Sequence, residues 1–328
     1  MSLWLHFVFC LTIAGVAGCD RGTESAATTQ TVSAKIRLQL NWVPEPQFGG
    51  FYAAKQAGAF QKQGLDVDVV PGGVGTPTVQ MVGAGSVEFG VVSADEVLVA
   101  RARGNDVVAL FAVYQTCPQG VMTHASRGFK EIGDVFRSPG TLAMQRGLPY
   151  ADYLLKKYPP PAGLRIVPSP GGSIAGFLAD KNFSQQCFVT SEPVLAKQQG
   201  ADPQTFLVAD AGYNPYTTVL ATSGSYLRQN RDVVAKVVRA VREGWTSYLA
   251  DPAPTHGVMQ SLNKTMDART FAESAAAQKP LIETDETRKA GPGVMTNQRW
   301  QTLAQQLADL KVIEKAPPAE ECFVWFGQ

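Results

Sequence analysis

The sequence has little of what a metal centre needs. Its 328 residues include five cysteines and three histidines. No pair of these residues has the spacing of a zinc or iron site, and His6, His124 and His256 are far apart in the chain. We therefore expect no metal ion and no other cofactor.

An excess of one charge is also missing. There are 29 Lys and Arg against 28 Asp and Glu, which gives a net charge of +1. Nucleic-acid binding needs surplus basic residues to displace counterions from phosphates, so no nucleic-acid partner is expected. Because 45% of the residues are apolar, the chain can bury a substantial core, in one large domain or two medium ones.

Only one apolar run approaches the length of a membrane span. The run Leu3–Ala17 is too short for an ordinary transmembrane helix, which needs about 20 residues. It leads into small residues and then Cys19, the order of a secretory signal with a lipidation site. We predict a signal peptide at 1–18, a lipid on Cys19 and a flexible tether at 19–34. No Lys or Arg precedes the apolar run, which leaves the true start codon open.

A lipid on an exported chain predicts a protein that folds in water while its anchor holds it to a membrane surface. The expected location is the periplasm or the outer face of the cytoplasmic membrane. Cys10 lies in the predicted signal peptide and Cys19 would carry the lipid, so the remaining cysteines are Cys117, Cys187 and Cys322. One disulfide could form among them, and the sequence does not select the pair.

From Lys35 onward, short β-runs alternate with helical stretches, a pattern that predicts a parallel-type sheet with helices on both faces. In the first series the pattern predicts strands at 35–40, 67–70, 89–92 and 107–114, and helices at 50–63, 77–83 and 94–103. A second series begins near Met122, where the composition turns to Ser, Arg, Gly and Lys. It predicts strands at 141–144, 164–167, 187–190 and 205–208, and helices at 149–157, 173–180 and 193–199.

The C-terminal part of the chain is predicted to be helical. Apolar residues recur at helical spacing from Asn230 to Leu249, and Asp251-Pro252 ends that helix. A chain in which strands come first and helices come last is predicted to form two α/β lobes. Lobe 1 is predicted to comprise 35–121 plus 222–328, and lobe 2 to comprise 122–221. The predicted crossings between the lobes lie near Val121–Ala125 and Val219–Ser223.

Several motifs in the mature chain resemble one family. The segment LNWVPEPQFGGFY occupies 40–52, and 58–67 has the form G-x-F-x-x-x-G-L-x-V. Phe89-Gly90-Val91, the helix from Asn230 to Pro252 and Gly293-Val294-Met295 follow in the expected order. Together they resemble periplasmic solute-binding proteins related to thiamine-pyrimidine-precursor binders and to the sulfonate, nitrate and taurine group. The resemblance covers about 35–313.

This resemblance implies a two-lobe α/β periplasmic-binding-protein fold of type II, with a ligand cleft between the lobes. It also implies a non-enzymatic, monomeric protein that closes around a small molecule by a hinge motion. The expected partners are the permease and ATPase subunits of an ABC importer, and the only contact with the membrane is the lipid anchor.

Ligands of open α/β sheets bind beyond the C-terminal ends of strands. Asn41 and Trp42 follow the first predicted strand, Gly72 and Gly73 the second, and Ser93, Asp95 and Glu96 the third. Gln115 and Gln119 follow the fourth strand, and Tyr213, Asn214 and Tyr216 precede the second crossing. The predicted ligand-binding residues are Asn41, Trp42, Phe48, Tyr52, Gly73, Ser93, Asp95, Gln115, Gly172, Glu192 and Tyr216.

These residues have alternative roles. The indole of Trp42 suits stacking on a heteroaromatic ring but also core packing, and Asn41 offers a donor and an acceptor but also builds turns. Ser93 can cap a helix, and a carboxylate in the first turn of a helix, such as Asp95, interacts favourably with the helix dipole. The resemblance implies that Glu192 is an acidic ligand contact, with helix N-terminal charge as its alternative.

The leading hypothesis is a binder of a small heteroaromatic molecule such as a thiamine pyrimidine precursor. A binder of sulfonate or nitrate would instead direct helix N-termini and Arg146 into the cleft. Relatives that make the thiamine pyrimidine from an active-site histidine carry a cysteine-rich iron-binding run, whereas Cys187 is isolated here. A periplasmic sensor module is the remaining alternative.

Overall fold

The computed structural model describes residues 35–327. The predicted signal peptide, the lipidated Cys19 and the tether lie outside the described residues. Among residues 35–327, no helix is both long enough and apolar enough to cross a membrane.

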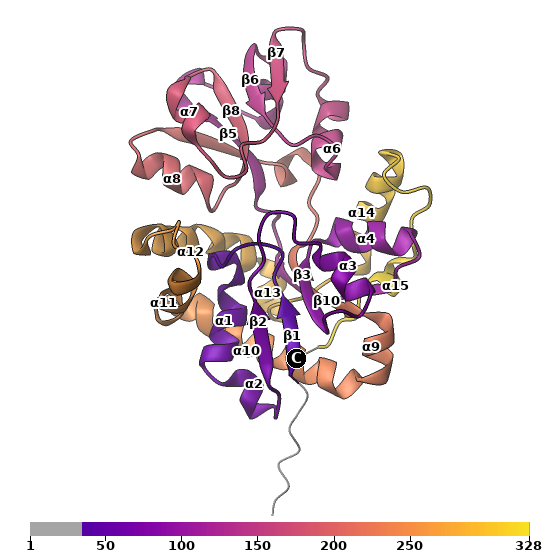
Figure 1. Cartoon of the computed structure of the whole chain (residues 1–328). Helices are drawn as coiled ribbons and strands as arrows, with labels where there is room; N and C mark the ends of the chain where they lie inside the picture. Colours follow the sequence, from indigo (N-terminus) through magenta and orange to yellow (C-terminus); the bar gives the residue numbers. More distant parts are fainter. Residues whose placement is uncertain (1–34, 328) are drawn as a thin grey trace, which may run out of the picture. The chain divides into compact units, whose positions relative to one another are not determined.

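Two five-stranded sheets organise the fold (Figure 1). The first has the order β2-β1-β3-β10-β4, and its strands are β1 (Ile36–Gln39), β2 (Val67–Val70), β3 (Phe89–Val92), β4 (Val107–Tyr114) and β10 (Thr217–Ser223). The second has the order β7-β6-β8-β5-β9, and its strands are β5 (Gln119–His124), β6 (Gly140–Ala143), β7 (Leu164–Val167), β8 (Phe183–Phe188) and β9 (Pro203–Leu207). We call these sheets with their helices lobe 1 and lobe 2.

Helices connect and follow the strands. Lobe 1 contains α1 (Gly49–Gln56), α2 (Ala59–Lys62), α3 (Thr78–Gly83) and α4 (Ala94–Ala102). Lobe 2 contains α5 (Ile132–Arg137), α6 (Pro149–Lys157), α7 (Ala175–Ala179) and α8 (Glu192–Gln198). The C-terminal part adds α9 (Gly224–Gln229), α10 (Arg231–Ala250), α11 (Ala253–Leu262), α12 (Ala268–Ile282), α13 (Asp285–Ala290), α14 (Asn297–Asp309) and α15 (Ala319–Cys322).

The strand pairing corrects three sequence predictions. Both sheets are mixed rather than parallel, because β10 is antiparallel to β3 and β4, and β5 is antiparallel to β8 and β9. The predicted crossing at Val121–Ala125 overlaps β5, which already belongs to the second sheet. The predicted crossing at Val219–Ser223 lies inside β10. The chain instead changes sheets at 115–118 and 208–216.

Other boundaries differ by a few residues. The predicted helix at 50–63 is two helices, because Gly58 adopts a left-handed conformation (φ 71°) between α1 and α2. The strand predicted at 187–190 is β8, which ends at Phe188. Strand β5 has no predicted counterpart, because the shift in composition near Met122 masks a buried strand.

Helix α10 forms the core of lobe 1 together with α1. Its apolar positions, including Trp245 and Tyr248, are buried as their helical spacing predicts. The two helices lie side by side (Figure 1) and cross closely at small residues. A Cβ added to Gly244 of α10 would lie 2.2 Å from the carbonyl oxygen of Gly50 in α1, so this contact requires glycine.

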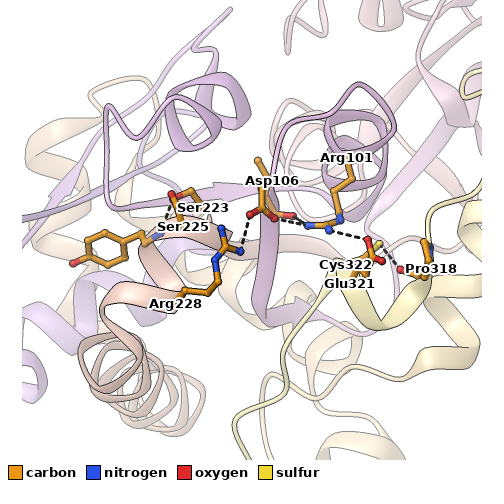
Figure 2. Close-up of polar contacts among 10 residues, drawn as sticks. Arg101, Asp106, Ser223, Ser225, Arg228, Pro318, Glu321 and Cys322 are labelled. Atoms are coloured by element: carbon orange, nitrogen blue, oxygen red, sulfur yellow. Dashed lines mark hydrogen bonds and ion pairs between the residues drawn. The ribbon is translucent and has the colours of Figure 1, made fainter.

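Charged side chains fix the C-terminal segment to lobe 1. Arg101 of α4 contacts Asp106 at 3.0 Å and Glu321 of α15 at 3.1 Å, and Arg228 of α9 contacts the other oxygen of Asp106 at 2.9 Å (Figure 2). The side chain of Arg101 is only 14% exposed, so its two ion pairs are less screened by solvent than the pair between the exposed Arg228 and Asp106. Cys117, Cys187 and Cys322 are buried and free.

Candidate ligand-binding cleft

A cavity of about 470 Å³ is lined by residues of both lobes. Lobe 1 contributes Asn41 after β1 and the length of α4, and lobe 2 contributes the start of α6 and the end of β8. The cavity thus lies where several strands end, as open α/β sheets predict. Its lining residues are Asn41, Val79, Gln80, Ser93, Asp95, Glu96, Val99, Ala100, Arg103, Asn105, Cys117, Gln119, Gly147, Leu148, Pro149, Tyr150, Phe188, Tyr213, Pro215, Thr217 and Val312.

The first turn of α4 places two carboxylates at the cavity wall. Ser93 forms a capping box with Glu96, whose Oε2 accepts a hydrogen bond from the Ser93 amide at 2.8 Å. The Ser93 hydroxyl also donates to Asp95, and the Tyr213 hydroxyl lies 3.5 Å from Asp95 Oδ2. Burial raises the pKa of Asp95 and of Glu96, although hydrogen bonds from Ser93 act in the opposite direction.

A second acidic group lies beside the cavity. The indole N–H of Trp42 donates to Glu45 Oε1 at 3.3 Å, and the backbone N–H of Phe188 donates to Glu192 Oε2 at 2.9 Å. Burial and the negative charge of Glu192 raise the pKa of Glu45 to about 7. Burial also raises the pKa of Glu192 to about 7. The negative charge of Glu192, in lobe 2, thus contributes to the raised pKa of Glu45, in lobe 1.

Amide side chains hold the Glu45 segment in place. Asn263 donates to the Pro44 carbonyl at 3.0 Å, and Gln278 donates to the Pro46 carbonyl at 3.0 Å. Gln278 in turn accepts a hydrogen bond from Tyr114 at 2.8 Å. All three side chains are buried, so Glu45 is presented by a fixed backbone rather than by a loose loop.

The two crossing segments are joined by Asn214. Its Oδ1 accepts hydrogen bonds from the Cys117 backbone N–H at 2.8 Å and from Arg299 at 3.0 Å. The guanidinium of Arg299 lies over the Tyr216 ring, 3.9 Å from its centroid. Thr218 has a φ of 53°, a strained conformation for a β-branched residue. The return to lobe 1 is thus tightly constrained beside the cavity.

The structure brings some predicted ligand-binding residues together and separates others. Asn41, Ser93 and Asp95 line the cavity, whereas Trp42 and Glu192 lie beside it through their neighbours Asn41 and Phe188. The other predicted residues are not among its lining residues; they are Phe48, Tyr52, Gly73, Gln115, Gly172 and Tyr216.

Most of these other residues pack in the core or form hydrogen bonds within the protein. Phe48 and Tyr52 pack in the lobe 1 core, and the Tyr216 hydroxyl accepts a hydrogen bond from the Thr296 backbone N–H at 3.1 Å. Gln115 is 2% exposed and donates to two backbone carbonyls. Gly172 is exposed in a turn (φ 91°). Ligand contact by these residues stays a prediction.

Three residues of this region are not among those predicted from the sequence. Glu45 lies within the quoted 40–52 motif, but nothing local shows that its carboxylate meets Glu192 from the other lobe. Phe188 is the last residue of β8, and Tyr150 lies in the first turn of α6; both positions are at the cavity wall. Their positions at a strand end and a helix start are the signals that could have identified them.

The described fold is that of the periplasmic binding proteins. The periplasmic aliphatic sulphonate binding protein SsuA of Escherichia coli superposes with a TM-score of 0.67 at 14% identity, over 90% of this chain and 92% of that chain. At this identity the likeness establishes the fold alone. Within that class, the chain belongs to the family described as NMT1/THI5 like, which matches residues 45–255.

Three similar proteins differ in what their names describe. The formylaminopyrimidine-binding protein of Halalkalibacterium halodurans is 23% identical, over 95% of this chain and 96% of the relative. The riboflavin-binding protein RibY of Chloroflexus aurantiacus is 24% identical over 76% and 74%. The 4-amino-5-hydroxymethyl-2-methylpyrimidine phosphate synthase THI11 of Saccharomyces cerevisiae is 25% identical over 66% and 68%. The relatives of this chain thus include both binding proteins and an enzyme.

Proposed function

We propose that this chain is the exported, lipid-anchored solute-binding component of an ABC importer and that it captures a small heteroaromatic molecule bearing an amino group. Its permease and ATPase partners would receive the ligand. The formylaminopyrimidine-binding relative, which spans nearly the whole chain, supports a pyrimidine ligand. Closure of the two lobes around the ligand would be absorbed at the crossing segments, 115–118 and 208–216.

One observation carries the choice of ligand. Glu45 and Glu192 come from different lobes and are both partly buried; burial raises the pKa of each to about 7, and the charge of Glu192 adds to the rise at Glu45. A ring amino group between them would donate to both carboxylates and so link the lobes, and Trp42, which packs against the lobe 1 core and donates to Glu45, would supply an aromatic face for the ring. An anion there would add to the repulsion, which disfavours sulfonate or nitrate at this position.

The surroundings of the histidines favour binding over catalysis. His124 stacks on Phe177 with ring centroids 3.9 Å apart, and its Nε2 lies 2.8 Å from the Phe177 carbonyl oxygen. His256 Nε2 lies 3.1 Å from the Tyr248 hydroxyl. Neither histidine is among the residues that line the cavity. A ligand recovered chemically unchanged after release, as judged by mass spectrometry, is the result we expect.

Calorimetry on two variants tests the proposal. The ligands are 4-amino-5-hydroxymethyl-2-methylpyrimidine and its deaminated analogue, in which an oxygen replaces the amino group. Loss of a charged hydrogen-bond partner costs about 1.5–3 kcal/mol, so we expect Glu192→Gln to weaken the aminopyrimidine by about 10- to 100-fold and the analogue much less. Loss of a stacking partner costs about 0.5–1.5 kcal/mol beyond the lost area, so Trp42→Ala should weaken both ligands alike.

The control is Glu243→Gln, which removes the same charge from the exposed ion pair with Lys62. It should leave both affinities unchanged. Equal losses for both ligands in Glu192→Gln would remove Glu192 from the site. If neither Glu192→Gln nor Trp42→Ala alters binding, the heteroaromatic ligand is wrong, and nitrate and alkanesulfonates become the ligands to measure.

A further inference from the structure

Helix α12 links the two lobes. Its apolar residues Phe271, Ala275 and Ile282 belong to the buried core of lobe 1. From the same helix, Glu273 Oε2 accepts a hydrogen bond at 3.0 Å from the side-chain amide of Gln198, which lies in α8 of lobe 2. A helix that is packed into one lobe thus holds a side chain of the other lobe.

Both ends of the Gln198 amide take part in this contact. Its Oε1 lies 2.8 Å from the Thr270 hydroxyl, which also lies 2.6 Å from Asp267 Oδ1. Asp267 is the N-cap of α12 and accepts a hydrogen bond from the Thr270 backbone N–H at 2.7 Å. Thr270 and Glu273 therefore have a fixed spacing at the capped start of α12, and one amide can meet both only if α8 lies in one position. We call Gln198, Thr270 and Glu273 the α8–α12 contact.

One face of α12 is polar although it is buried. Thr270, Ser274 and Gln278 follow one another at intervals of four residues, which places them on the same face. Each of the three is at most 2% exposed, and the Ser274 hydroxyl has no hydrogen-bond partner among residues 35–327. Burial of a hydroxyl without a partner is unfavourable, and water removes that cost when the face is exposed. A polar row of this kind suits a boundary that is buried when the lobes meet and hydrated when they separate.

The same helix also contacts the proposed ring site and a crossing segment. Gln278 donates to the Pro46 carbonyl at 3.0 Å, next to Glu45. Near the end of α12, the Leu281 carbonyl accepts hydrogen bonds from the two backbone N–H groups of residues 115–116, at 3.0 and 2.9 Å. Helix α12 thus contacts the segment that carries Glu45, the segment where the chain leaves lobe 1, and lobe 2 itself.

Helix α8 connects this contact to Glu192. Glu192 is the first residue of α8 and Gln198 is the last, so they are about 9 Å apart along the helix axis. The Glu192 carboxylate is also held by the Phe188 backbone N–H at 2.9 Å. Because the seven residues between these points form one continuous helix, the contact at Gln198 sets where Glu192 lies relative to Glu45.

We infer that the α8–α12 contact is a latch that stabilises the closed arrangement of the lobes and so positions Glu192 for the ligand. The inference rests on the proposed function in that a ligand is taken between the lobes, but it requires no particular ligand. Gln198, Thr270 and Glu273 are positioning residues, and none of them lines the cavity. A latch favours the closed state by a fixed amount, so it raises the affinity for every ligand that needs closure by the same factor.

Opposite charges at position 198 test the latch without a ligand. Gln198→Glu would bring a second carboxylate to Glu273, whereas Gln198→Lys would bring an ammonium group to the same oxygen. Arg269 contacts the other oxygen of Glu273, at 2.7 Å, so Oε2 stays available to the lysine. Small-angle scattering on the ligand-free full chain should give a larger radius of gyration for Gln198→Glu than for Gln198→Lys. Identical profiles would overturn the latch and leave the proposed function standing.

Binding measurements separate the latch from the ring site. Gln198→Ala should weaken 4-amino-5-hydroxymethyl-2-methylpyrimidine and its deaminated analogue alike, by about 3- to 10-fold for one partly exposed hydrogen bond. The loss should appear as faster dissociation with an unchanged association rate, measured by stopped-flow fluorescence. The matched control is Gln305→Ala, because the Gln305 amide donates at 2.8 Å to Asp309 of its own helix; both affinities should stay unchanged.

The outcomes distinguish the two proposals. A loss in Gln198→Ala that is confined to the amino-bearing ligand would place Gln198 in the ring site and overturn the latch. If scattering separates Gln198→Glu from Gln198→Lys but neither pyrimidine binds the unaltered chain, the latch stands and the proposed ligand is wrong.

Discussion

The close crossing of α1 and α10 gives the sharpest prediction about stability. Gly244→Ala would place a Cβ 2.2 Å from the Gly50 carbonyl oxygen, 2.6 Å from the Ala54 Cβ and 2.7 Å from the Ala54 backbone N. Two of these three atoms are backbone atoms, so no side-chain rotation relieves the overlap. The two helices would have to separate by about 1 Å, because carbon–carbon contacts are most favourable at about 3.5–4.0 Å.

The expected loss combines two opposing terms. Overpacking a tight core typically costs about 1–3 kcal/mol, and here the separation also loosens Trp245, whose ring packs edge-on against Phe51. Alanine is favoured over glycine inside a helix by about 1 kcal/mol. The clash exceeds this gain because it involves rigid backbone, so we expect the free energy of unfolding to fall by about 2 kcal/mol.

Gly257→Ala is the matched control. Gly257 is an exposed position inside α11, and an added Cβ there meets no atom within 4 Å. The same substitution should therefore stabilise the protein by up to about 1 kcal/mol through helix propensity and reduced entropy of the unfolded chain. Urea unfolding followed by tryptophan fluorescence measures both variants, with equal m-values as the check on two-state behaviour. A Gly244→Ala variant as stable as Gly257→Ala would refute the argument from close packing.

Two further predictions concern the carboxylate pair and the anchor. The raised pKa values of Glu45 and Glu192, both about 7, mean that the folded protein binds more protons than the unfolded chain between about pH 4.5 and 7. Their contribution to stability therefore falls as the pH rises through this window, by up to about 1.4 kcal/mol per pH unit for each group. Glu192→Gln should flatten this dependence in urea unfolding between pH 5 and 8, and an unchanged slope would contradict the raised pKa of Glu192. Cys19→Ala should release the chain from the membrane fraction while ligand affinity is preserved, and continued membrane attachment would show that Cys19 is not the anchor.

Local sequence patterns determined much of the fold. The helical spacing of apolar residues predicted α10, because a helix that buries one stripe carries apolar residues every three to four positions. The continuous apolar run at 107–114 predicted β4, because a strand that is buried on both faces is apolar throughout. The serine–glutamate spacing at Ser93 and Glu96 likewise marks the start of α4 as a capping box. The alternation of these elements was enough to predict two α/β lobes.

The tertiary structure alone decided the chemistry of the site. Glu45 and Glu192 are 147 residues apart, and only the packing of the two lobes brings their charges together. Phe48 and Tyr52 share a motif with Trp42, yet they are turned into the core, because η1 (Pro46–Phe48) and α1 direct successive side chains to different sides. Periodicity reports which face of an element is buried. It carries no information about which distant residue lies opposite, and that pairing is what makes a binding site.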